Sequence, residues 1–369
     1  SKLIKIAAED KTVVSLGPGE PDFSLDPALI KAAQEAAKNC NHYSPPGGRT
    51  DLKEAIVKKL KKENNIKATP DNIIVTCGSQ EAILLATACT LDVSEQIIVP
   101  NPSFLGFLPT FELLNAFPVQ LELKEEENWD INPDSLKKLI DKKKTKAILI
   151  NTPSNPTGNV LSRKILEEIA DIAVENNIYV FSDEAYEKLT YGKQHFSIAS
   201  LNGMEKYTVT FHTFSKSYAM CGFRVGYAVA PRNLVEAMKK THIYTTLCAP
   251  TISQMVAKKA LEVGAPFTEK MRKEYDRRRK FIVKRLNDMG LPTVTPRGAF
   301  YTFSNITSVI DESYKFAYDL LKKEKVAVVP GKEFGSLGEG YIRCSYATAY
   351  EKIELAMEKL ERYIKKHKR

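Results

Sequence analysis

The chain has 369 residues, of which 43% are hydrophobic and 27% are charged, an ordinary composition for a globular protein. A prior of about 150 residues per domain predicts two domains. The composition excludes intrinsic disorder, collagen and fibrous coiled coils. Because no run of 18 apolar residues occurs, we expect no transmembrane helix and no membrane partner.

The positive charge of the chain does not indicate a nucleic-acid partner. The net charge is +9, but the surplus is divided among short runs at 142–144, 277–280 and 365–369. We expect residues 277–280, within MRKEYDRRRK, to be the solvated face of a helix. No recognition motif and no interleaving of aromatic and basic residues accompanies these runs. The charge is therefore interpreted as a contribution to solubility.

The cysteines and histidines do not form a metal-binding pattern. The cysteines are irregularly spaced, without a CxxC pair or a Cys/His cluster, which argues against zinc and thioredoxin-like chemistry. His195, His212 and His242 have no partner at metal-ligand spacing, so no metal is expected. The opening SKLIKIAAEDK is too short and too charged for a secretory signal, so reduced thiols in the cytoplasm are expected. The six cysteines are Cys40, Cys77, Cys89, Cys221, Cys248 and Cys344.

Residues 70–230 alternate short apolar runs with stretches of helical periodicity. This alternation predicts an α/β fold, a mostly parallel sheet of seven strands with helices on both faces. Helices are expected at 81–88 and 163–175, among others. The expected strands are 73–76, 96–99, 119–123, 147–150, 178–182, 207–211 and 225–230.

The pattern changes after a long charged helix that is expected at 269–289. Short strands then mix with helices, which predicts a smaller α+β unit. The expected strands are 293–294, 299–303, 326–329 and 341–345, and the expected helices are 313–323 and 350–366.

Ligands of doubly wound sheets bind beyond the carboxyl ends of the strands, so residues that follow each strand are candidates for chemistry. Gly78, Ser79 and Gln80 follow the first expected strand and open a helix. Free backbone N–H groups and the helix dipole favour an anion at such a place. The same residues could form only a tight turn with Ser79 as the helix N-cap. GxGxxG and GxxxxGK patterns do not occur here, so no nucleotide is indicated.

Two further strand ends carry polar residues. The segment 151–158, NTPSNPTG, has two Asn turns and two prolines that fix the backbone, which suits a residue held toward a ligand. It could also be only a turn into the next helix. Asp183 follows an apolar strand, where a carboxylate is costly unless a cation meets it. A structural ion pair would satisfy Asp183 equally well.

The segment 213–226 supplies two cations between two expected strands. Lys216 lies among hydroxyl and small residues, which is unusual for a surface lysine, and burial would make it a nucleophile for carbonyl compounds. Arg224, eight residues later, offers a fixed cation for a phosphate. A buried Lys, a strand-end Asp and an anion site together describe an aldehyde cofactor with a cationic ring nitrogen and a phosphate. Pyridoxal 5′-phosphate has these properties.

At this point the chain, from Val14 to its C-terminus, closely resembles the class I aminotransferases. These are the fold-type-I pyridoxal-phosphate enzymes related to aspartate aminotransferase, and the nearest likeness is to archaeal-type members that act on aspartate or aromatic amino acids. Each motif alone is weak, but seven motifs in the family's order exclude a chance agreement. They are GEPDF (19–23), HYSPPGG (42–48), NPSF (101–104), NPTG (155–158), SDEAY (182–186), SK with GFR (215–224) and YIRCSYA (341–347).

The resemblance implies catalytic roles for three residues. Lys216 would be the Schiff-base lysine and the proton carrier, and Asp183 would keep the pyridine nitrogen protonated. Tyr186 would hydrogen-bond the ring hydroxyl oxygen together with Asn155. Phe104 would stack on the ring face, where several relatives carry Trp.

The resemblance also implies how phosphate and substrate are bound. Arg343 would clamp the α-carboxylate of the substrate, with the backbone at Gly19 nearby and Phe104 and Asn155 lining the same site. Tyr43 resembles a tyrosine that reaches the phosphate of the neighbouring subunit, which implies a homodimer with shared active sites. The other phosphate ligands would be Gly78, Ser79, Gln80, Thr213, Ser215 and Arg224, with Thr213 in a position that is more often Ser or Gly.

The resemblance therefore predicts a cytoplasmic aminotransferase that moves an amino group from an L-amino acid to a 2-oxo acid such as 2-oxoglutarate. A large cofactor-binding domain is expected at 40–270, and a small domain at 1–39 plus 271–369. A fold-type-I carbon–sulfur β-lyase and a cofactor-dependent regulator are the alternatives. Trp129 lies in a polar, acidic loop and is expected at the surface.

Overall fold

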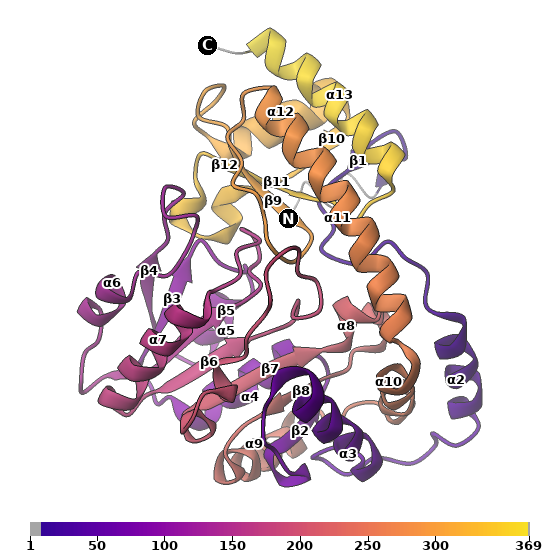
Figure 1. The fold of residues 1–369 in the computed structure, drawn as a ribbon, viewed down its shortest axis with the longest axis vertical. Coiled ribbons are helices and arrows are strands. Elements are labelled where there is room, and N and C mark those ends of the chain that lie inside the picture. Colours follow the sequence, from indigo (N-terminus) through magenta and orange to yellow (C-terminus); the bar gives the residue numbers. More distant parts are fainter. Residues whose placement is uncertain (1–8, 368–369) are drawn as a thin grey trace.

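The computed structural model describes residues 9–367. It contains a seven-stranded sheet, a three-stranded sheet and one short parallel pair of strands. Figure 1 shows the larger sheet in the lower part of the molecule and the two smaller sheets in the upper part. None of the helices described is long and apolar enough to cross a membrane.

The large sheet has the strand order β2-β8-β7-β6-β5-β3-β4. All neighbours are parallel except β8, which runs antiparallel to both β2 and β7. This confirms the expected mostly parallel sheet of seven strands. The strands are β2 (Ile73–Thr76), β3 (Gln96–Asn101), β4 (Phe117–Glu122), β5 (Thr145–Asn151), β6 (Tyr179–Asp183), β7 (Thr208–Thr213) and β8 (Gly226–Val229).

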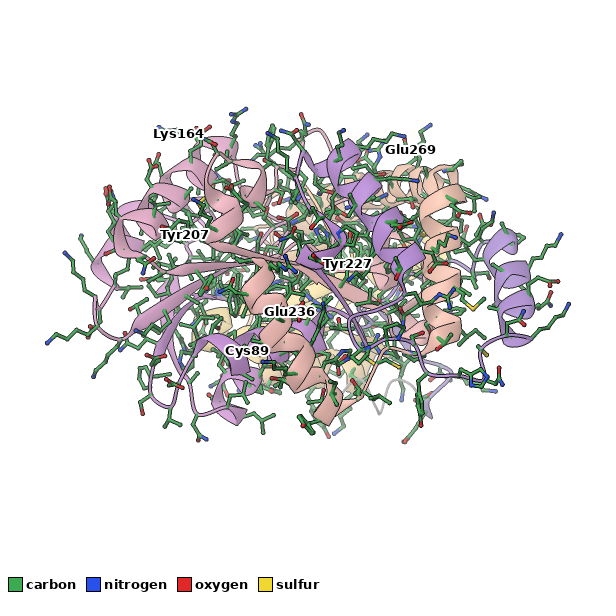
Figure 2. The ribbon with its side chains drawn as sticks, turned by 90° about the horizontal axis from the view of Figure 1, so that it is seen from below. Cys89, Lys164, Tyr207, Tyr227, Glu236 and Glu269 are labelled. Carbon is green, nitrogen blue, oxygen red and sulfur yellow. The ribbon has the colours of Figure 1, made fainter. Side chains whose placement is uncertain are left out.

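Both faces of this sheet are covered because its strands are apolar on both sides. Leu149 packs on one face, while its neighbours Ile148 and Ile150 pack on the other. Figure 2 places Lys164 of α7 on one side of the sheet, and Cys89 of α4 and Glu236 of α9 on the other. The helices around the sheet are α2 (Pro27–Ala37), α3 (Thr50–Lys59), α4 (Ser79–Thr90), α5 (Phe107–Leu113), α6 (Pro133–Lys138), α7 (Arg163–Asn176), α8 (Phe214–Ser217), α9 (Arg232–Thr245) and α10 (Thr251–Val263).

The long helix α11 (Ala265–Asp288) connects the two parts of the molecule. Beyond it, β9 (Tyr301–Asn305) and β11 (Val329–Pro330) flank β12 (Tyr341–Ser345) in an antiparallel sheet. The helices α12 (Ser313–Glu324) and α13 (Tyr350–His367) pack beside this sheet. The N-terminal β1 (Val14–Ser15) pairs in parallel with β10 (Val326–Ala327), so the beginning of the described chain joins this α+β unit.

The structure corrects two expected strands. Residues 293–294 form only an isolated bridge, between Thr293 and Ser304. The expected strand 326–329 is two short strands, β10 and β11, which belong to different sheets. The chain pairs with β1 through β10 and with β12 through β11. Four consecutive apolar residues do not reveal this change of pairing, because it depends on tertiary structure.

Three side-chain expectations were also wrong. Trp129 is 3% exposed, and its ring packs edge-on against Phe303 and Tyr341 of the α+β unit, so it is a core residue. Arg278 is buried within the supposed solvated run, because its guanidinium pairs with Asp22 at 2.9 Å. The N-cap of α4 is Gly78, and Ser79 is the first residue of the helix.

Candidate active site

A cavity of about 680 Å³ opens at the carboxyl ends of the parallel strands, against the smaller sheet. Asn151, Asp183 and Thr213 end β5, β6 and β7 and line this cavity. All the site residues expected from the sequence line it except Gly78 and Tyr43. These are Gly19, Ser79, Gln80, Phe104, Asn155, Asp183, Tyr186, Thr213, Ser215, Lys216, Arg224 and Arg343.

One end of the cavity is a cradle for an anion. Gly78 has φ +87°, a left-handed backbone conformation that favours glycine. Nη2 of Arg224 lies 2.7 Å from the place that a Cβ of residue 78 would take, so the arginine closely approaches the helix N-terminus. Thr213 Oγ1 donates to Ser215 Oγ at 3.0 Å, which keeps both hydroxyls at the same place. Arg224 is fixed by donation to the carbonyl of Cys221 at 3.1 Å. The helix dipole, two hydroxyls and a guanidinium together suit a phosphate.

Lys216 reaches the middle of the cavity from the short helix α8. Its Nζ donates to the carbonyl oxygen of Gly19 at 2.5 Å and lies 5.9 Å from the ring centre of Tyr186. The amine therefore stands between the end of the large sheet and the N-terminal segment. Lys216 is half-buried, where the sequence analysis expected a buried lysine.

Asp183 is 6% exposed, and its Oδ1 accepts a hydrogen bond from the backbone N–H of Ala185 at 3.1 Å. Burial raises the pKa of Asp183 to about 7, with a further increase from the charge of Glu184 and an opposing effect of Lys216. A carboxylate in this setting would be stabilised by a cationic partner in the cavity.

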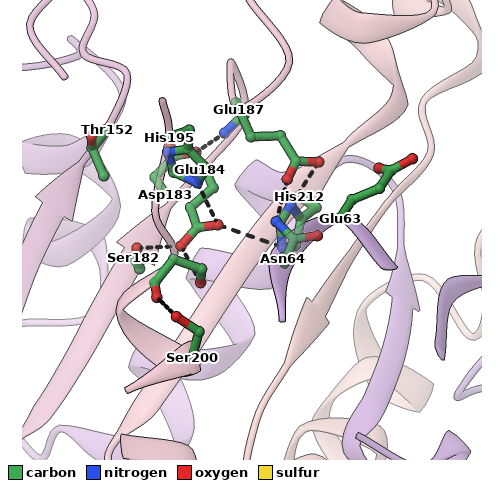
Figure 3. Close-up of polar contacts among 12 residues, drawn as sticks. Glu63, Asn64, Thr152, Ser182, Asp183, Glu184, Glu187, His195, Ser200 and His212 are labelled. Atoms are coloured by element: carbon green, nitrogen blue, oxygen red, sulfur yellow. Dashed lines mark hydrogen bonds and ion pairs between the residues drawn. The ribbon is translucent and has the colours of Figure 1, made fainter. Parts of the chain in front are cut away.

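Asp183 is followed by a second buried carboxylate, Glu184, which does not line the cavity. Glu184 lies instead in a polar network (Figure 3). Glu184 accepts hydrogen bonds from Ser182 at 3.0 Å and Ser197 at 2.7 Å, and its Oε2 lies 3.0 Å from Nε2 of His195. Burial acts to raise the pKa of Glu184, but His195 and His212 lower it on balance.

Glu187 extends this network toward α3. Lys59 contacts its Oε1, Asn64 donates to its Oε2 at 2.5 Å, and Nδ1 of His212 lies 3.4 Å away. Ligand atoms of Glu184, Glu187 and His195 lie within 4.8 Å of one another, as in a metal site. Because the Lys59 ammonium already neutralises Glu187, we interpret the cluster as a structural ion network.

The sequence reasoning missed this network. It treated His195, His212 and His242 only as metal candidates without partners, whereas each lies near a carboxylate, His242 at 3.2 Å from Glu81. The signal in the sequence was the pair Glu184 and Glu187, two acidic residues three positions apart in SDEAYEK (182–188).

Arg343 forms the opposite wall of the cavity, on β12. The side chain is buried, with Nη1 donating to Asn155 Oδ1 at 3.1 Å and Nη2 donating to the carbonyl of Gly17 at 2.7 Å. Its buried Nε has no hydrogen-bond partner among residues 9–367. A buried cation with an unused donor is suited to a carboxylate ligand.

Aromatic residues complete the cavity. Phe104 lines it and packs edge-on against Phe107, with ring centres 5.4 Å apart. The hydroxyls of Tyr186 and Tyr301 are 2.8 Å apart, and burial raises the pKa of Tyr186 well above its usual range. Tyr301 was not expected here, because its place in an alternating strand indicates only a core residue. Other lining residues that the sequence did not single out are Gly17, Pro18, Glu20, Leu105, Ala185 and Cys221.

Tyr43 lies outside the cavity of its own chain and is 85% exposed. The structure of one chain therefore leaves the expected role of Tyr43 in a neighbouring subunit as a prediction.

Comparisons with known proteins agree with this geometry. Residues 11–360 match the family described as aminotransferase class I and II. The chain is 47% identical to an aspartate aminotransferase of Pyrococcus abyssi and 45% identical to aromatic-amino-acid aminotransferase 2 of Thermococcus litoralis, with 100% of this chain and 95% of each relative covered. The crystal structure of an aromatic aminotransferase from Pyrococcus horikoshii superposes with a TM-score of 0.94 at 47% identity, covering 99% of both chains.

Proposed function

The chain belongs to the class I and II aminotransferases, and we propose that it uses pyridoxal 5′-phosphate to aminate a 2-oxo acid such as 2-oxoglutarate. The amino donor we propose is aspartate or an aromatic L-amino acid, as the names of the relatives suggest. The observation that carries this proposal is the meeting of Lys216, Asp183 and Arg343 in one cavity with an anion cradle.

The residues present fit this cofactor in three respects. The cradle at Ser79, Thr213 and Arg224 suits its phosphate. The raised pKa of Asp183 marks a carboxyl group that is short of a cationic partner, which a protonated ring nitrogen would provide. The amine of Lys216 lines the same cavity as these two places and would hold the cofactor covalently.

Pyridoxal phosphate, when bound, supplies an aldehyde that captures amino groups and a protonated ring that withdraws electrons from the substrate Cα. Lys216 is the base that we propose moves the proton from Cα, through its Nζ. Asp183 holds the proton on the ring nitrogen, and Tyr186 and Asn155 would hydrogen-bond the ring oxygen. Phe104 would cover the ring face.

Arg343 is proposed to bind the substrate α-carboxylate. Asn155 and the carbonyl of Gly17 fix its guanidinium, so little side-chain entropy is lost when the carboxylate binds. The carboxylate would orient Cα toward Lys216, and orientation of this kind is a major source of rate enhancement.

We also propose a cytoplasmic homodimer with shared sites, and a division into a large domain at 40–270 and a small domain at 1–39 plus 271–369. The α+β unit carries Arg343, whereas Asp183 ends β6 of the large sheet and Lys216 lies on α8, directly after β7. Movement of the two parts would therefore close the site around the substrate.

The proposal is tested by loading the protein with pyridoxal phosphate, reducing it with borohydride and mapping the labelled peptide. We expect the label on Lys216, and we expect Lys216→Ala to abolish transamination while the fold and most of the cofactor affinity persist. Lys164→Ala, on the exposed side of α7, is the matched control and should behave as wild type. A label on a different lysine would contradict the assignment.

A panel of amino acids would define the substrate. Each is tested in a single half-reaction, and the loss of the cofactor's visible absorption is the readout. Pyruvate released without an amino acceptor would instead indicate the lyase alternative.

A further inference from the structure

Tyr301 occupies a place in the cavity that the roles above do not explain. It begins β9, is completely buried and lines the cavity. In the antiparallel pair with β12, Tyr301 is opposite Ser345, while Arg343 is opposite Phe303. Tyr301 and Arg343 are therefore diagonal neighbours on one face of the sheet, close enough for long side chains to touch.

The ring of Tyr301 contacts the guanidinium of Arg343. The Cζ atom of Arg343 lies 4.4 Å from the ring centre of Tyr301 and 4.9 Å from that of Phe334. Both distances are within the range of cation–π attraction. Both Nη atoms also donate hydrogen bonds. The two rings therefore restrict the tilt of the guanidinium, and its two hydrogen-bond acceptors restrict its rotation.

The hydroxyl of Tyr301 has a separate contact, with the hydroxyl of Tyr186 at 2.8 Å. The space for this contact exists because residue 19 is glycine: a Cβ there would be 2.8 Å from the Tyr301 oxygen. A tyrosine hydroxyl has only one proton to donate. If Tyr186 donates its proton to the ring oxygen of the cofactor, Tyr301 must be the donor in the tyrosine pair.

We propose that Tyr301 is a positioning residue with two separable actions. Its ring holds the guanidinium of Arg343 in the orientation that receives the substrate carboxylate, and its hydroxyl donates to Tyr186 so that the proton of Tyr186 points to the cofactor. This inference rests on the proposed function of the site.

Three variants separate the two actions. Tyr301→Phe keeps the ring and removes the hydroxyl, whereas Phe334→Leu removes the other ring on Arg343 and leaves the tyrosine pair intact. Tyr301→Leu removes both contacts of Tyr301. Each protein is loaded with pyridoxal phosphate and checked for retained helix content by circular dichroism.

Two measurements report the two actions without relying on turnover. The first is the pH at which the visible absorption of the bound cofactor changes. The second is the dissociation constant of 3-phenylpropanoate, a monocarboxylate that has no amino group and does not react.

For Tyr301→Phe we expect the absorption change to move upward by on the order of half a pH unit, with nearly unchanged 3-phenylpropanoate binding. The reason is that a less polarised Tyr186 is a weaker donor, so the cofactor's ring oxygen holds its proton more tightly. For Phe334→Leu we expect about fivefold weaker binding and an unchanged absorption midpoint. Tyr301→Leu should show both effects.

If the pH midpoint of the absorption change is unchanged in Tyr301→Phe, the proposed action of the hydroxyl is wrong. It is also wrong if Phe334→Leu shifts this midpoint equally, because the shift would then come from a general loosening of the site. If Tyr301→Leu binds 3-phenylpropanoate as well as Tyr301→Phe does, the action of the ring is wrong. If Tyr301→Leu does not fold, Tyr301→Met, which also removes the ring, takes its place in the comparison with Tyr301→Phe. A wild-type protein that develops no visible absorption with pyridoxal phosphate would instead contradict the proposed function.

Discussion

Asp183 and Glu184 are consecutive buried carboxyl groups whose pKa values are shifted in opposite directions. Glu184 has two serine hydroxyls and two histidines around it, which stabilise its charged form. Asp183 faces the cavity with the backbone N–H of Ala185 as its hydrogen-bond donor. The strand end thus has Glu184 on one side, where its negative charge is stabilised by hydrogen-bond donors and histidines. On the side that faces the cavity it has Asp183, whose charged form is destabilised by burial.

This difference predicts how Asp183 affects the apoprotein. A raised pKa means that the folded state binds more protons than the unfolded state between the usual value near 4 and about 7. Stability should therefore fall as the pH rises through this window, by up to about 4 kcal/mol. Asp183→Asn keeps the oxygen that accepts from Ala185 and removes the charge, so the variant apoprotein should be more stable than wild type at pH 8. Urea unfolding midpoints at pH 5 and pH 8 measure the effect.

The same variant should have a slow chemical step. Without the carboxylate, a ring nitrogen beside residue 183 would lose its proton, and removal of such a preorganised charge costs several kcal/mol of activation free energy. Single-turnover kinetics measure this loss. A near-normal rate, or an apoprotein whose stability at pH 8 does not increase, would contradict the role assigned to Asp183.

At the scale of elements, α3 and the helical turn after it contact the segment that follows Asp183. Lys59 at the end of α3 and Asn64 in the following turn both bind Glu187, and Glu63 pairs with Lys188 at 2.9 Å. These contacts connect residues near position 60 to the segment that begins with Asp183 and Tyr186. The position of that segment therefore depends on a helix more than 100 residues earlier in the chain.

Breaking this connection should be costly because the side chain of Lys59 is only 6% exposed and that of Glu187 only 11%. Lys59→Met leaves the carboxylate of Glu187 without its neighbouring cation, and we expect a loss of stability on the order of 3 kcal/mol. Thermal unfolding of the apoprotein measures it. Lys62→Met, at an exposed lysine of the same turn, is the matched control and should change stability by less than about 0.5 kcal/mol.

A second variant tests the physical reason. Lys59→Met combined with Glu187→Gln removes both charges and should recover part of the lost stability, since the cost comes from the unpaired carboxylate. If the double variant is less stable than Lys59→Met alone, the contribution of Lys59 is packing and not charge.

At the scale of the whole molecule, the cavity exists because three parts of the chain meet. The end of the large sheet supplies Asp183, the helix α8 after β7 supplies Lys216, β12 supplies Arg343, and the N-terminal segment passes between them at Gly17 and Gly19. The segment after Gly19 is itself anchored to α11, where Arg278 binds Asp22. In the proposed homodimer, the exposed Tyr43 of a second chain would be a fourth part.

The proposed shared site predicts complementation between two inactive variants. Tyr43→Glu would repel the phosphate of the neighbouring site, and Lys216→Ala removes the base of its own site. In a heterodimer one site carries both changes and the other carries neither, so activity should return toward half that of a wild-type dimer. Activity after subunit exchange, with heterodimer formation measured by native mass spectrometry, is the test.

Each variant incubated alone is the control and should remain inactive. Heterodimers that form without recovering activity would place Tyr43 in its own chain. A milder change, Tyr43→Phe, should weaken cofactor retention by about 1 kcal/mol, the contribution of one hydrogen bond.

The sequence by itself determined the elements and chemistry that are local along the chain. Strand–helix alternation between 70 and 230 predicted the seven-stranded sheet, and the rule that ligands bind at strand ends directed attention to Asp183, Lys216 and the turn at Gly78. The prediction of the sheet is confirmed because the hydrophobic period of a strand is set by neighbouring residues. The strand-end residues are likewise read from local sequence, and their roles stay predictions.

The tertiary structure alone decided which residues meet across the fold. Trp129 is in the core because Phe303 and Tyr341 pack on it, Arg278 is buried because Asp22 pairs with it, and Tyr301 enters the site through its contacts with Tyr186 and Arg343. No local period encodes such pairs, since their partners are distant in sequence. Burial makes each pair favourable only after the sheet, α11 and the α+β unit have come together.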